Sequence, residues 1–480
     1  MRGFHVENFG CRAARADGEA VGERLRAAGL NERDAAGADV VVVNTCSVTA
    51  EADRAARAFI RRAHRRNPAA RIVVTGCYAQ RAPEELAGLP GVAAVVGNSH
   101  KALTPEIALR LAESRLGAES GAVEIVSIQS ILSATSVRGT APIWADDRYA
   151  HSFLEEAQPL PGGQTRPNLK IQEGCGNRCT FCVIPQTRGA SRSLPARAIL
   201  KQVNGFVEAG GNELVLSGIN LGRWGRDFSG GLSGDRGEGP RTLGGLVQWI
   251  FGETGLPRLR LSSIEPMDWD AELIGIVAEF GGGRLARHAH LPLQSGSDAV
   301  LRRMHRRYRP WHYEEKVWAL VEAAGPELTV GADVMVGFPG ETDGEFEETV
   351  ELVRRLPFGY LHLFPFSPRP GTRGWALHAE KPVAAQVVEE RMGVLRMLAA
   401  EKSWGHRRGF IGRELEAITL NSARDLDGSV GLTENFLPVE LEGRLAANCL
   451  VRVRASGLNG EGTLRGELVP VADAVHSFGG

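Results

Sequence analysis

The chain has 480 residues, of which 43% are hydrophobic and 24% charged, so it is a globular protein whose length predicts two to four domains. Its longest apolar runs, such as residues 40–43, are far too short to cross a membrane, and the first ten residues lack the layout of a signal peptide, so we expect a cytoplasmic protein. The formal net charge of −1 gives no general indication of nucleic-acid binding.

Seven cysteines carry most of the chemical information, and six of them form two triplets. An odd number of cysteines in a reducing compartment argues against a disulfide framework and favours metal binding or catalysis. The seventh, Cys449, lies within a strand pattern, where we expect a buried thiol without partners. The first triplet is widely spaced and the second tightly spaced; they are Cys11, Cys46 and Cys77, and Cys175, Cys179 and Cys182.

The first hundred residues alternate between strand and helix patterns and predict a small doubly wound α/β domain over residues 1–101. Each cysteine of the first triplet follows the carboxyl end of an expected strand, where parallel sheets bind ligands, so the three should converge. Three buried structural thiols are the alternative. The expected strands cover residues 4–8, 38–46, 71–77 and 92–97, and the expected helices cover residues 19–30, 51–66 and 83–87.

The rest of the chain divides into three parts, so the expected fold class is α/β with a small all-β tail. Residues 102–165 are interpreted as a linker with one helix near residues 104–116. Residues 166–400 contain six strand patterns separated by helices, too few for a closed eight-fold barrel, and predict a partial (β/α)6 barrel. Residues 401–475 have short strands with turn residues, which predict a small all-β barrel. The six strand patterns begin at residues 168, 213, 258, 288, 329 and 360.

The second triplet has the spacing C-x3-C-x2-C and directly follows the first strand of the partial barrel. Zinc sites prefer paired C-x2-C units with four ligands in total, and zinc remains the alternative here. Three close thiolates without a fourth nearby suit an iron–sulfur cluster that keeps one open iron. An open iron allows a small chelating molecule to bind there and be reduced.

This cysteine motif resembles that of the radical S-adenosylmethionine (SAM) superfamily, in which three cysteines hold a [4Fe–4S] cluster and SAM caps the fourth iron. With the first triplet and the β-rich tail, the chain is similar to the radical SAM methylthiotransferases over nearly its whole length, the linker excepted. Supporting segments are NTCSVTAEADR (44–54), GCYAQ (76–80), LKIQEGC (169–175), SSIEP (262–266), HLPLQSGSD (290–298), VGFPGET (336–342) and SPRPGT (367–372).

The resemblance implies two [4Fe–4S] clusters, SAM as cofactor, and a tail similar to the RNA-binding TRAM domain. The second, auxiliary cluster would be held by the first triplet and would present the sulfur. The resemblance also implies tRNA as the partner and a reductant such as flavodoxin or ferredoxin. The hydrogen on adenine C2 is neither acidic nor hydridic, so acid–base catalysis alone cannot remove it, whereas a 5′-deoxyadenosyl radical can. Both clusters should therefore face one cavity.

Three substrate classes occur in this family: threonylcarbamoyladenosine in tRNA, isopentenyladenosine in tRNA, and an aspartate of a ribosomal protein. The segments CSVTAEADR, GCYAQ, LSGINLGRWG (216–225) and GLTENFLPV (431–439) look like the threonylcarbamoyladenosine branch. The isopentenyladenosine branch would show a different sequence after the second cysteine and GCMAQ at the third. One departure from the family is the segment after Cys11, RAARADGEA, where an Asn and a polar stretch are usual.

Residues near the strand ends of the partial barrel are candidate SAM contacts. For the two glycines, an ordinary helix C-cap is an equal alternative. For the other residues, the alternative is a structural role, as a hydrogen-bonded polar residue at a strand end or as a histidine in the core. The candidates are Gly210, Gly211, Glu213, Ser262, Glu265, His290, Gln294 and Asp333.

Two local basic runs are candidate phosphate contacts, although a solvated face in an Arg-rich chain gives the same pattern. One lies on the expected helix at residues 51–66. In the tail, which is not basic, an exposed aromatic such as Phe436 would have to contribute to RNA binding. The second run comprises Arg302, Arg303, Arg306 and Arg307.

A non-catalytic iron–sulfur protein that binds RNA is the alternative from another functional class. Structural clusters usually have four protein ligands, so the open position in each triplet argues against it.

Overall fold

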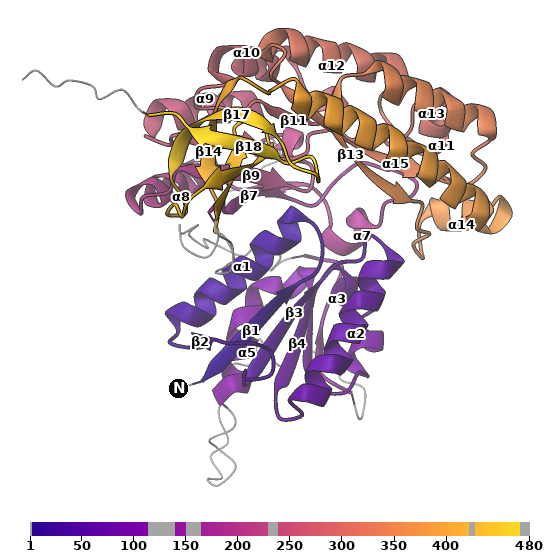
Figure 1. Ribbon diagram of the computed structural model, residues 1–480. Helices are drawn as coiled ribbons and strands as arrows, with labels where there is room; N and C mark the ends of the chain where they lie inside the picture. The colour runs from indigo at the N-terminus through magenta and orange to yellow at the C-terminus, as the bar shows by residue number, and fades with distance from the viewer. Residues whose placement is uncertain (1, 114–139, 150–164, 229–238, 422–427, 471–480) are drawn as a thin grey trace, which may run out of the picture.

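The computed structural model describes residues 2–113, 140–149, 165–228, 239–421 and 428–470. The chain forms a parallel-sheet domain at the N-terminus, a larger central domain and a small C-terminal barrel that packs beside the central domain (Figure 1). No described helix combines the length and the apolar character needed to cross a membrane.

The N-terminal domain is a six-stranded parallel sheet with helices on both faces, as the sequence predicts. The strand order is β2-β1-β3-β4-β5-β6. On one face α1 and α5 pack on the sheet through Val21, Leu25 and Ala108, and on the other face α2, α3 and α4 pack through residues such as Ile60 and Tyr78. The strands are β1 (Gly3–Asn8), β2 (Asn31–Glu32), β3 (Val40–Thr45), β4 (Arg71–Gly76), β5 (Val92–Gly97) and β6 (Ile143–Trp144); the helices are α1 (Arg12–Ala27), α2 (Ala50–Arg66), α3 (Cys77–Arg81), α4 (Pro83–Ala87) and α5 (Thr104–Glu113).

Part of the segment interpreted as a linker belongs to this sheet. The expected helix near residues 104–116 is α5, and β6 pairs in parallel with β5 at the edge of the sheet. Much of the rest of the expected linker lies outside the described residues. A two-residue strand leaves almost no hydrophobic periodicity in the sequence, which is why the pairing of β6 was not predicted.

The central domain contains all six predicted strands, and all six run parallel. They form two hydrogen-bonded groups, β10-β9-β7 with a short antiparallel β8, and β11-β12-β13. A bridge between Leu259 and Leu285 connects the two groups into one open, partial barrel. The strands are β7 (Asn168–Glu173), β8 (Arg192–Ser193), β9 (Glu213–Gly218), β10 (Arg258–Leu261), β11 (His288–His290), β12 (Thr329–Val336) and β13 (Phe358–Pro365).

Helices cover the outside of this barrel and share its largest hydrophobic core. The start of α13 shows how local sequence fixes such a helix: Thr342 and Glu345 form a reciprocal capping box. The helices are α7 (Ile184–Arg188), α8 (Ala196–Glu208), α9 (Leu243–Glu253), α10 (Ala271–Phe280), α11 (Asp298–Arg303), α12 (Pro310–Ala324), α13 (Asp343–Arg355), α14 (Arg373–Glu380) and α15 (Ala385–Arg408).

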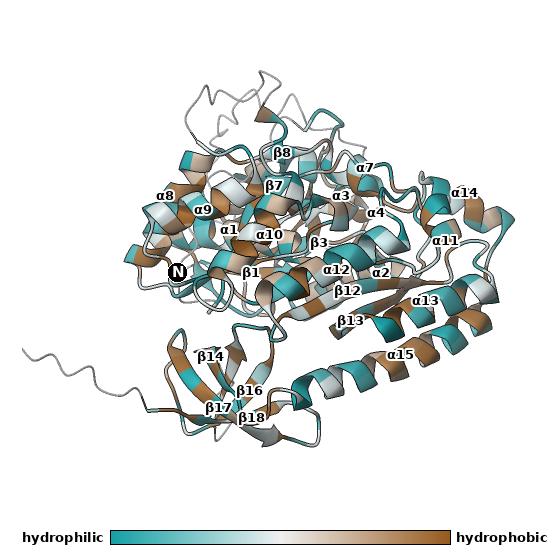
Figure 2. Cartoon of the chain, turned by 90° about the horizontal axis from the view of Figure 1, so that it is seen from above, coloured by the Kyte–Doolittle hydropathy of each residue, from teal (hydrophilic) through white to brown (hydrophobic). Residues whose placement is uncertain are grey.

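The long helix α15 leads from the central domain to the C-terminal barrel, as Figure 2 shows from above. That barrel is closed, with strand order β14-β15-β16-β18-β17 and its own small core, which confirms the all-β prediction. Cys449 is exposed, so the prediction of a buried thiol is wrong: it immediately precedes β17, outside the alternating pattern. The strands are β14 (Glu414–Thr419), β15 (Gly428–Thr433), β16 (Pro438–Glu442), β17 (Leu450–Leu458) and β18 (Leu464–Leu468).

A buried cluster of five charged residues joins the N-terminal domain to the central barrel. Lys101 Nζ lies 3.1 Å from Asp17 Oδ2 and 2.7 Å from Glu173 Oε2. Arg188 Nη1 contacts the same two carboxylates at 3.2 and 2.7 Å, and Lys170 contacts both as well. We call these five residues the interdomain charge cluster.

Three cations and two carboxylates stabilise one another in this cluster without contact with water. Burial alone would raise the pKa of Glu173, but the charges of Arg188, Lys101 and Lys170 hold that pKa well below its usual value. The pKa of Asp17 is lowered in the same way, against the opposing effect of burial. Because both carboxyl groups have folded-state pKa values below their unfolded ones, their stabilising contribution is present at neutral pH and is lost as acid protonates them.

We predict that Lys101→Met lowers the free energy of unfolding by about 3–5 kcal/mol, because it leaves two buried carboxylates short of a partner. Urea denaturation of the full chain measures the change. Lys381→Met, which alters an exposed lysine, is the matched control and should leave the midpoint unchanged. Equal stability of the two variants would show that the charge cluster does not hold the domains together.

Candidate metal centres

The second cysteine triplet lies in the loop between β7 and α7, at the carboxyl end of the first barrel strand. Each of two sulfurs there receives N–H groups from its surroundings. Cys175 Sγ accepts from the backbone N–H of Asn177 at 3.4 Å and from Asn220 Nδ2 at 3.6 Å. Cys179 Sγ accepts from Arg306 Nη1 at 3.3 Å. All three cysteines line an open pocket of about 420 Å³.

The first triplet occupies the carboxyl edge of the N-terminal sheet, as predicted from its position after three strands. Cys11 directly precedes α1, Cys46 follows β3, and Cys77 begins α3 after β4. Gly10 has a φ of +117° and leaves no room for a side chain, since a Cβ would lie 2.6 Å from the Cβ of Cys46. This close approach brings the Cys11 loop against Cys46.

The sulfur of Cys77 lies at the contact between the two domains. Cys77 Sγ accepts from Asn98 Nδ2 at 3.4 Å and from Arg188 Nε at 3.2 Å. Arg188 ends α7, the helix that follows Cys182, so one short helix connects the two triplets. The same guanidinium belongs to the interdomain charge cluster, which couples domain docking to the position of the first triplet.

The donor sets fit iron–sulfur clusters. Burial, and then the neighbouring thiols Cys77 and Cys11, raise the pKa of Cys46 to about 12, and burial raises the pKa of Cys182 to about 12. Such thiols stay protonated without a metal, whereas a bound metal deprotonates its thiol ligands. N–H groups aimed at the sulfurs and a nearby guanidinium then stabilise the added negative charge. Each triplet offers three sulfur ligands.

Two of the predicted SAM contacts, Ser262 and Glu265, follow the carboxyl end of β10, and Glu265 is linked to the second triplet. Ser262 is buried directly after β10. Glu265 accepts two hydrogen bonds from Arg306 Nη2, at 2.8 and 2.7 Å, and Arg306 in turn donates to Cys179. Glu265 is thus linked to a cysteine of the triplet through one guanidinium.

Three other predicted SAM contacts are misplaced: Gly210, Gly211 and Glu213 lie at the opposite end of the barrel. Gly210 ends α8 with a φ of +82° and accepts a hydrogen bond from Asn448 in the C-terminal barrel. Gly211 packs on Phe206. Glu213 is the first residue of β9 and is buried among arginines of β10. The ordinary helix C-cap is therefore the correct interpretation of the two glycines.

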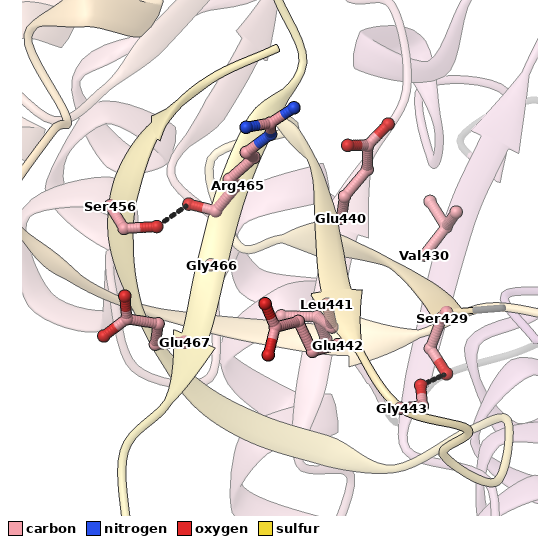
Figure 3. Close-up of a pocket in the computed structure, with 11 residues that line it drawn as sticks. Ser429, Val430, Glu440, Leu441, Glu442, Gly443, Ser456, Arg465, Gly466 and Glu467 are labelled. Carbon is pink, nitrogen blue, oxygen red and sulfur yellow. Dashed lines mark hydrogen bonds between the residues drawn. The ribbon is translucent and has the colours of Figure 1, made fainter.

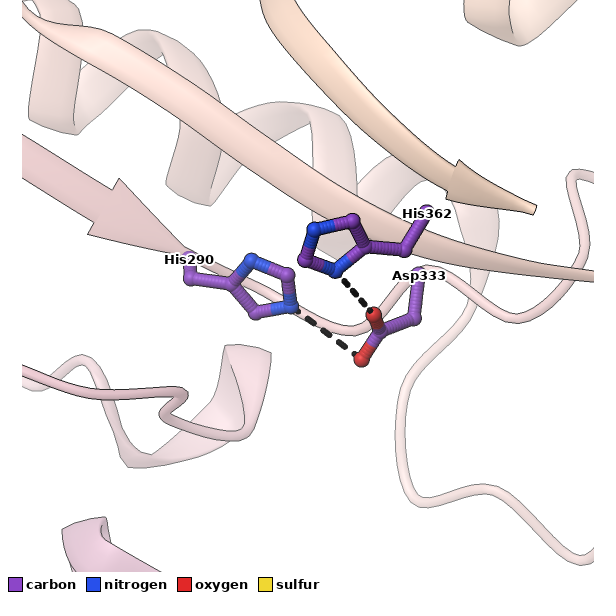
Figure 4. Close-up of side chains that lie close together, drawn as sticks. All are labelled: His290, Asp333 and His362. Atoms are coloured by element: carbon purple, nitrogen blue, oxygen red, sulfur yellow. Dashed lines mark hydrogen bonds and ion pairs between the residues drawn. The ribbon is translucent and has the colours of Figure 1, made fainter. Parts of the chain in front are cut away.

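The last three predicted contacts lie inside the barrel. His290 Nε2 lies 3.1 Å from Asp333 Oδ2, and His362 Nδ1 lies 3.2 Å from Asp333 Oδ1 (Figure 4). The hydrogen bonds from the two histidines lower the pKa of Asp333, against the opposing effect of burial. The three side chains are close enough to hold a metal ion. Gln294 has a φ of +66°, and its backbone pairs with β12 on both sides of Val334: its N–H donates to the carbonyl of Asp333, and its carbonyl accepts from the N–H of Met335.

Sequence reasoning missed the residues that shape the Cys175 loop. Gln172 Nε2 donates to the carbonyl of Gly174 at 2.8 Å, and Gln172 Oε1 accepts from the backbone N–H of Asn220 at 2.7 Å. The position of Asn220 just past the carboxyl end of β9 was the available signal, because ligands bind at that end of a parallel sheet.

The four arginines at residues 302–307 differ in burial and in their partners. Arg306 is buried beside the second triplet, so it cannot make the phosphate contact that was predicted for it. Arg302 pairs with Asp298, and Arg303 makes two 2.7 Å contacts with Glu345. Arg307 is exposed and remains a candidate for RNA contact.

The C-terminal barrel has a pocket of about 450 Å³ that is acidic rather than basic. Figure 3 shows Glu440, Glu442 and Glu467 around it with a single arginine, Arg465. Like charges disfavour phosphate there. Phe436, predicted to be an exposed RNA-stacking aromatic, is instead half-buried against His288, with ring centroids 4.4 Å apart.

The comparisons with known proteins agree with this geometry. Residues 3–97 match the family described as "Uncharacterized protein family UPF0004", and residues 169–353 match the radical SAM superfamily. Threonylcarbamoyladenosine tRNA methylthiotransferase MtaB of Aquifex aeolicus is 37% identical, over 87% of this chain and 90% of that protein. MtaB of Bacillus subtilis is 35% identical, over 92% of this chain and 90% of that protein.

A second group of relatives carries another name. The tRNA-2-methylthio-N(6)-dimethylallyladenosine synthase of Cereibacter sphaeroides is 32% identical, over 95% of this chain and 97% of that protein. Among solved structures, the radical SAM methyltransferase TsrM of Kitasatospora setae has a TM-score of 0.51 at 14% identity, covering 76% of this chain and 73% of that one. This last likeness shows the fold alone.

A partial parallel barrel with three cysteines directly after its first strand defines a radical SAM enzyme, which uses a [4Fe–4S] cluster and SAM. With the matched N-terminal domain and relatives that cover almost the whole chain, the protein belongs to the radical SAM methylthiotransferase family.

We predict that Cys175→Ala, Cys179→Ala and Cys182→Ala each abolish SAM cleavage. Each removes one of three ligands from a cluster, so the iron content of reconstituted protein should fall from about eight to about four per chain. Colorimetric iron analysis and chromatography of 5′-deoxyadenosine measure the two effects. Cys449→Ala is the control, since that thiol is exposed and far along the chain; full iron in a Cys179→Ala variant would contradict the assignment.

The division of the arginine run gives a second prediction. Arg306→Gln should slow SAM cleavage while leaving tRNA affinity unchanged, because its guanidinium contacts Cys179 and Glu265 rather than solvent. Arg307→Gln should weaken tRNA binding and leave the rate of SAM cleavage unchanged. It should reduce the salt dependence of tRNA binding by about 0.7–0.9 in log–log slope, the value for one phosphate contact. Weaker tRNA binding by Arg306→Gln would contradict the buried placement.

Proposed function

We propose that the chain transfers a methylthio group to C2 of threonylcarbamoyladenosine, the modified adenosine 3′ of the anticodon in tRNA. The observation that carries this proposal is the link between the two cysteine triplets: Arg188 of α7 binds Cys77 and ends the helix that follows Cys182. Two metal centres held this way can serve one substrate. The relatives with the highest identities reported above are named for this substrate.

The chemistry requires two separate tasks. The adenine C2 hydrogen must be removed by a radical, since it is neither acidic nor hydridic at neutral pH. Cys175, Cys179 and Cys182 would hold the cluster that supplies the electron for SAM cleavage, and Cys11, Cys46 and Cys77 would hold the cluster that supplies the sulfur. Each triplet offers one ligand fewer than the four that structural clusters usually have, which would leave one position open for these tasks.

The residues of the chain hold these parts in place. Cys11, Cys46 and Cys77 would bind the auxiliary cluster, and Asn98 and Arg188 donate hydrogen bonds to its ligand Cys77. Ser262 and Glu265 are proposed to contact SAM, since they follow β10 at the edge where the second triplet lies. His290, Gln294 and Asp333 are proposed to line the same cavity. Arg302, Arg303 and Arg307 are proposed to lie toward the tRNA.

A small acidic redox protein such as flavodoxin or ferredoxin is proposed as the reductant, and the cytoplasm as its place of action. The support for this partner is charge: Arg178 and Arg373 are exposed at the pocket that the second triplet lines. The proposed domains are residues 1–101, to which α5 and β6 are added, residues 166–400 and residues 401–475.

The test is mass spectrometry of tRNA nucleosides from a strain that lacks this gene. Complementation with the wild-type chain should convert threonylcarbamoyladenosine to its 2-methylthio form. A chain with Cys11, Cys46 and Cys77 all changed to Ala should still cleave SAM but transfer no methylthio group. Its control is Cys449→Ala, which should restore the modification.

Two other outcomes identify the alternatives. Modification of isopentenyladenosine alone would assign the chain to the branch of the Cereibacter sphaeroides relative. Methylthiolation of a ribosomal protein, with tRNA unchanged, would replace the RNA substrate altogether. A triple cysteine variant that still modifies tRNA would show that the first triplet is structural.

A further inference from the structure

Three arginines from distant parts of the chain meet inside the partial barrel. Arg12 is the first residue of α1 and directly follows Cys11, Arg166 precedes β7, and Arg260 lies in β10. Arg166 and Arg260 both contact Glu213, and Arg12 and Arg260 both lie over the ring of Phe436. Burial, opposed by the charge of Glu213 and aided by those of Arg260 and Arg12, lowers the pKa of Arg166 to about 10. We call the three residues the arginine cluster.

The charge of the arginine cluster is only partly compensated. Glu213 Oε1 lies 2.9 Å from Arg260 Nε and 3.5 Å from Arg166 Nη1. The other oxygen of Glu213 contacts Arg258, at 3.2 Å. The guanidinium of Arg12 makes no hydrogen bond or ion pair with any residue in the described part of the chain. Arg258 is also paired with Glu416, so Glu213 is the carboxylate that the described residues offer to the arginine cluster, and an excess of positive charge remains there.

Two donors in this region, Arg260 Nη1 and Arg166 Nε, are buried and lack an acceptor among the described residues. The buried His288 Nδ1 also lacks a hydrogen-bond partner there. Buried donors without acceptors are costly, so their presence indicates that a ligand completes the site. The surroundings of His288 also favour an anion over a cation. Burial, and then the charges of Arg260 and Arg12, hold the pKa of His288 well below its usual value. Any further cation is disfavoured here.

Aromatic rings form the walls beside these donors. The Arg12 and Arg260 guanidinium carbons lie 5.5 and 5.4 Å from the centre of the Phe436 ring. Tyr360 stacks on His288 and lies 5.6 Å from Phe436. Arg12, Tyr360 and Phe436 are all half-buried, so the region remains accessible to a ligand. Cationic groups beside aromatic rings suit a small anion attached to an organic group.

We infer that the arginine cluster binds the carboxylate of the threonylcarbamoyl group, with Arg12 as the residue that selects this substrate. The inference rests on the proposed function and names the groups that recognise its substrate. The threonine part of that side chain ends in a carboxylate, which a guanidinium binds with charge-assisted hydrogen bonds. Because Arg12 follows Cys11 in sequence, the anchored base lies beside the triplet that would carry the sulfur.

The same site rejects an uncharged side chain. An isopentenyl group would leave Arg12 and the buried donors unpaired, and sites built for a polar group discriminate strongly against analogues that lack it. A backbone phosphate of the RNA is the other source of an anion. We favour the carboxylate because Phe436, Tyr360 and His288 enclose the arginines within the barrel, away from the exposed Arg307.

The experiment compares two anticodon stem-loop RNAs that differ in one group. One carries threonylcarbamoyladenosine, and the other carries the same base with the threonine carboxylate replaced by a carboxamide. The wild-type holoenzyme should prefer the carboxylate about 10- to 100-fold in kcat/KM for methylthiolation, the size expected for hydrogen bonds to a charged group. Arg12→Gln should lose most of this preference, mainly through KM for the carboxylate RNA.

The matched control is Arg15→Gln, an exposed arginine one turn along the same helix, which should keep the wild-type preference. If Arg12→Gln fails to retain its iron, Arg166→Gln tests the same cluster at a distance from the cysteines. An equal loss for both RNAs with a shallower salt dependence would show a phosphate contact and overturn the inference. A wild-type enzyme that modifies both RNAs equally overturns it too, while one that modifies neither overturns the proposed function itself.

Discussion

The interdomain charge cluster is the interaction on which the rest of the structure depends. Among the residues that the structure describes, the sheet domain and the partial barrel share no continuous hydrophobic core; the buried apolar residues of each form separate groups. What joins them at the level of the metal centres is a set of buried ion pairs among Asp17, Glu173 and three cations. Such pairs tolerate little displacement, because each partner left alone is a buried charge. They therefore fix the distance between the two triplets more strictly than apolar packing would.

Arg188 shows how this constraint reaches the chemistry. Its Nη1 takes part in the ion pairs, while its Nε donates to the sulfur of Cys77. A shift of the N-terminal domain would thus change the hydrogen bonding of Cys77, the proposed cluster ligand, and with it the electronic properties of a cluster bound there. Arg188 therefore both holds the two domains together and donates a hydrogen bond to the sulfur of Cys77.

Much of the fold and of the metal centres could be predicted from the sequence, because both rest on local signals. Continuous valine runs such as residues 40–43 identify buried parallel strands, and the carboxyl ends of those strands locate the cysteines. The prediction that Gly210 and Gly211 contact SAM was wrong because both precede β9. Ligands bind at the carboxyl ends of parallel strands, and these glycines lie at the amino end. The sequence could not show that Arg306 is buried while its neighbours are exposed. Its burial depends on tertiary structure, because the loop between α11 and α12 packs against the Cys179 loop. The arginine cluster could not be predicted for a related reason, because its members lie far apart in sequence.

The seam between β10 and β11 has a consequence for how the enzyme could evolve. Strand pairing there is reduced to one bridge, and the turn from Thr433 to Phe436 of the C-terminal barrel lies across it. Phe436 has a φ of +66°, an unfavourable conformation for an aromatic residue that the turn's hydrogen bonds to Thr433 sustain. The C-terminal barrel thus forms part of the wall that closes the central barrel at this seam. Replacing it with another domain would open the seam, so the two barrels must change together.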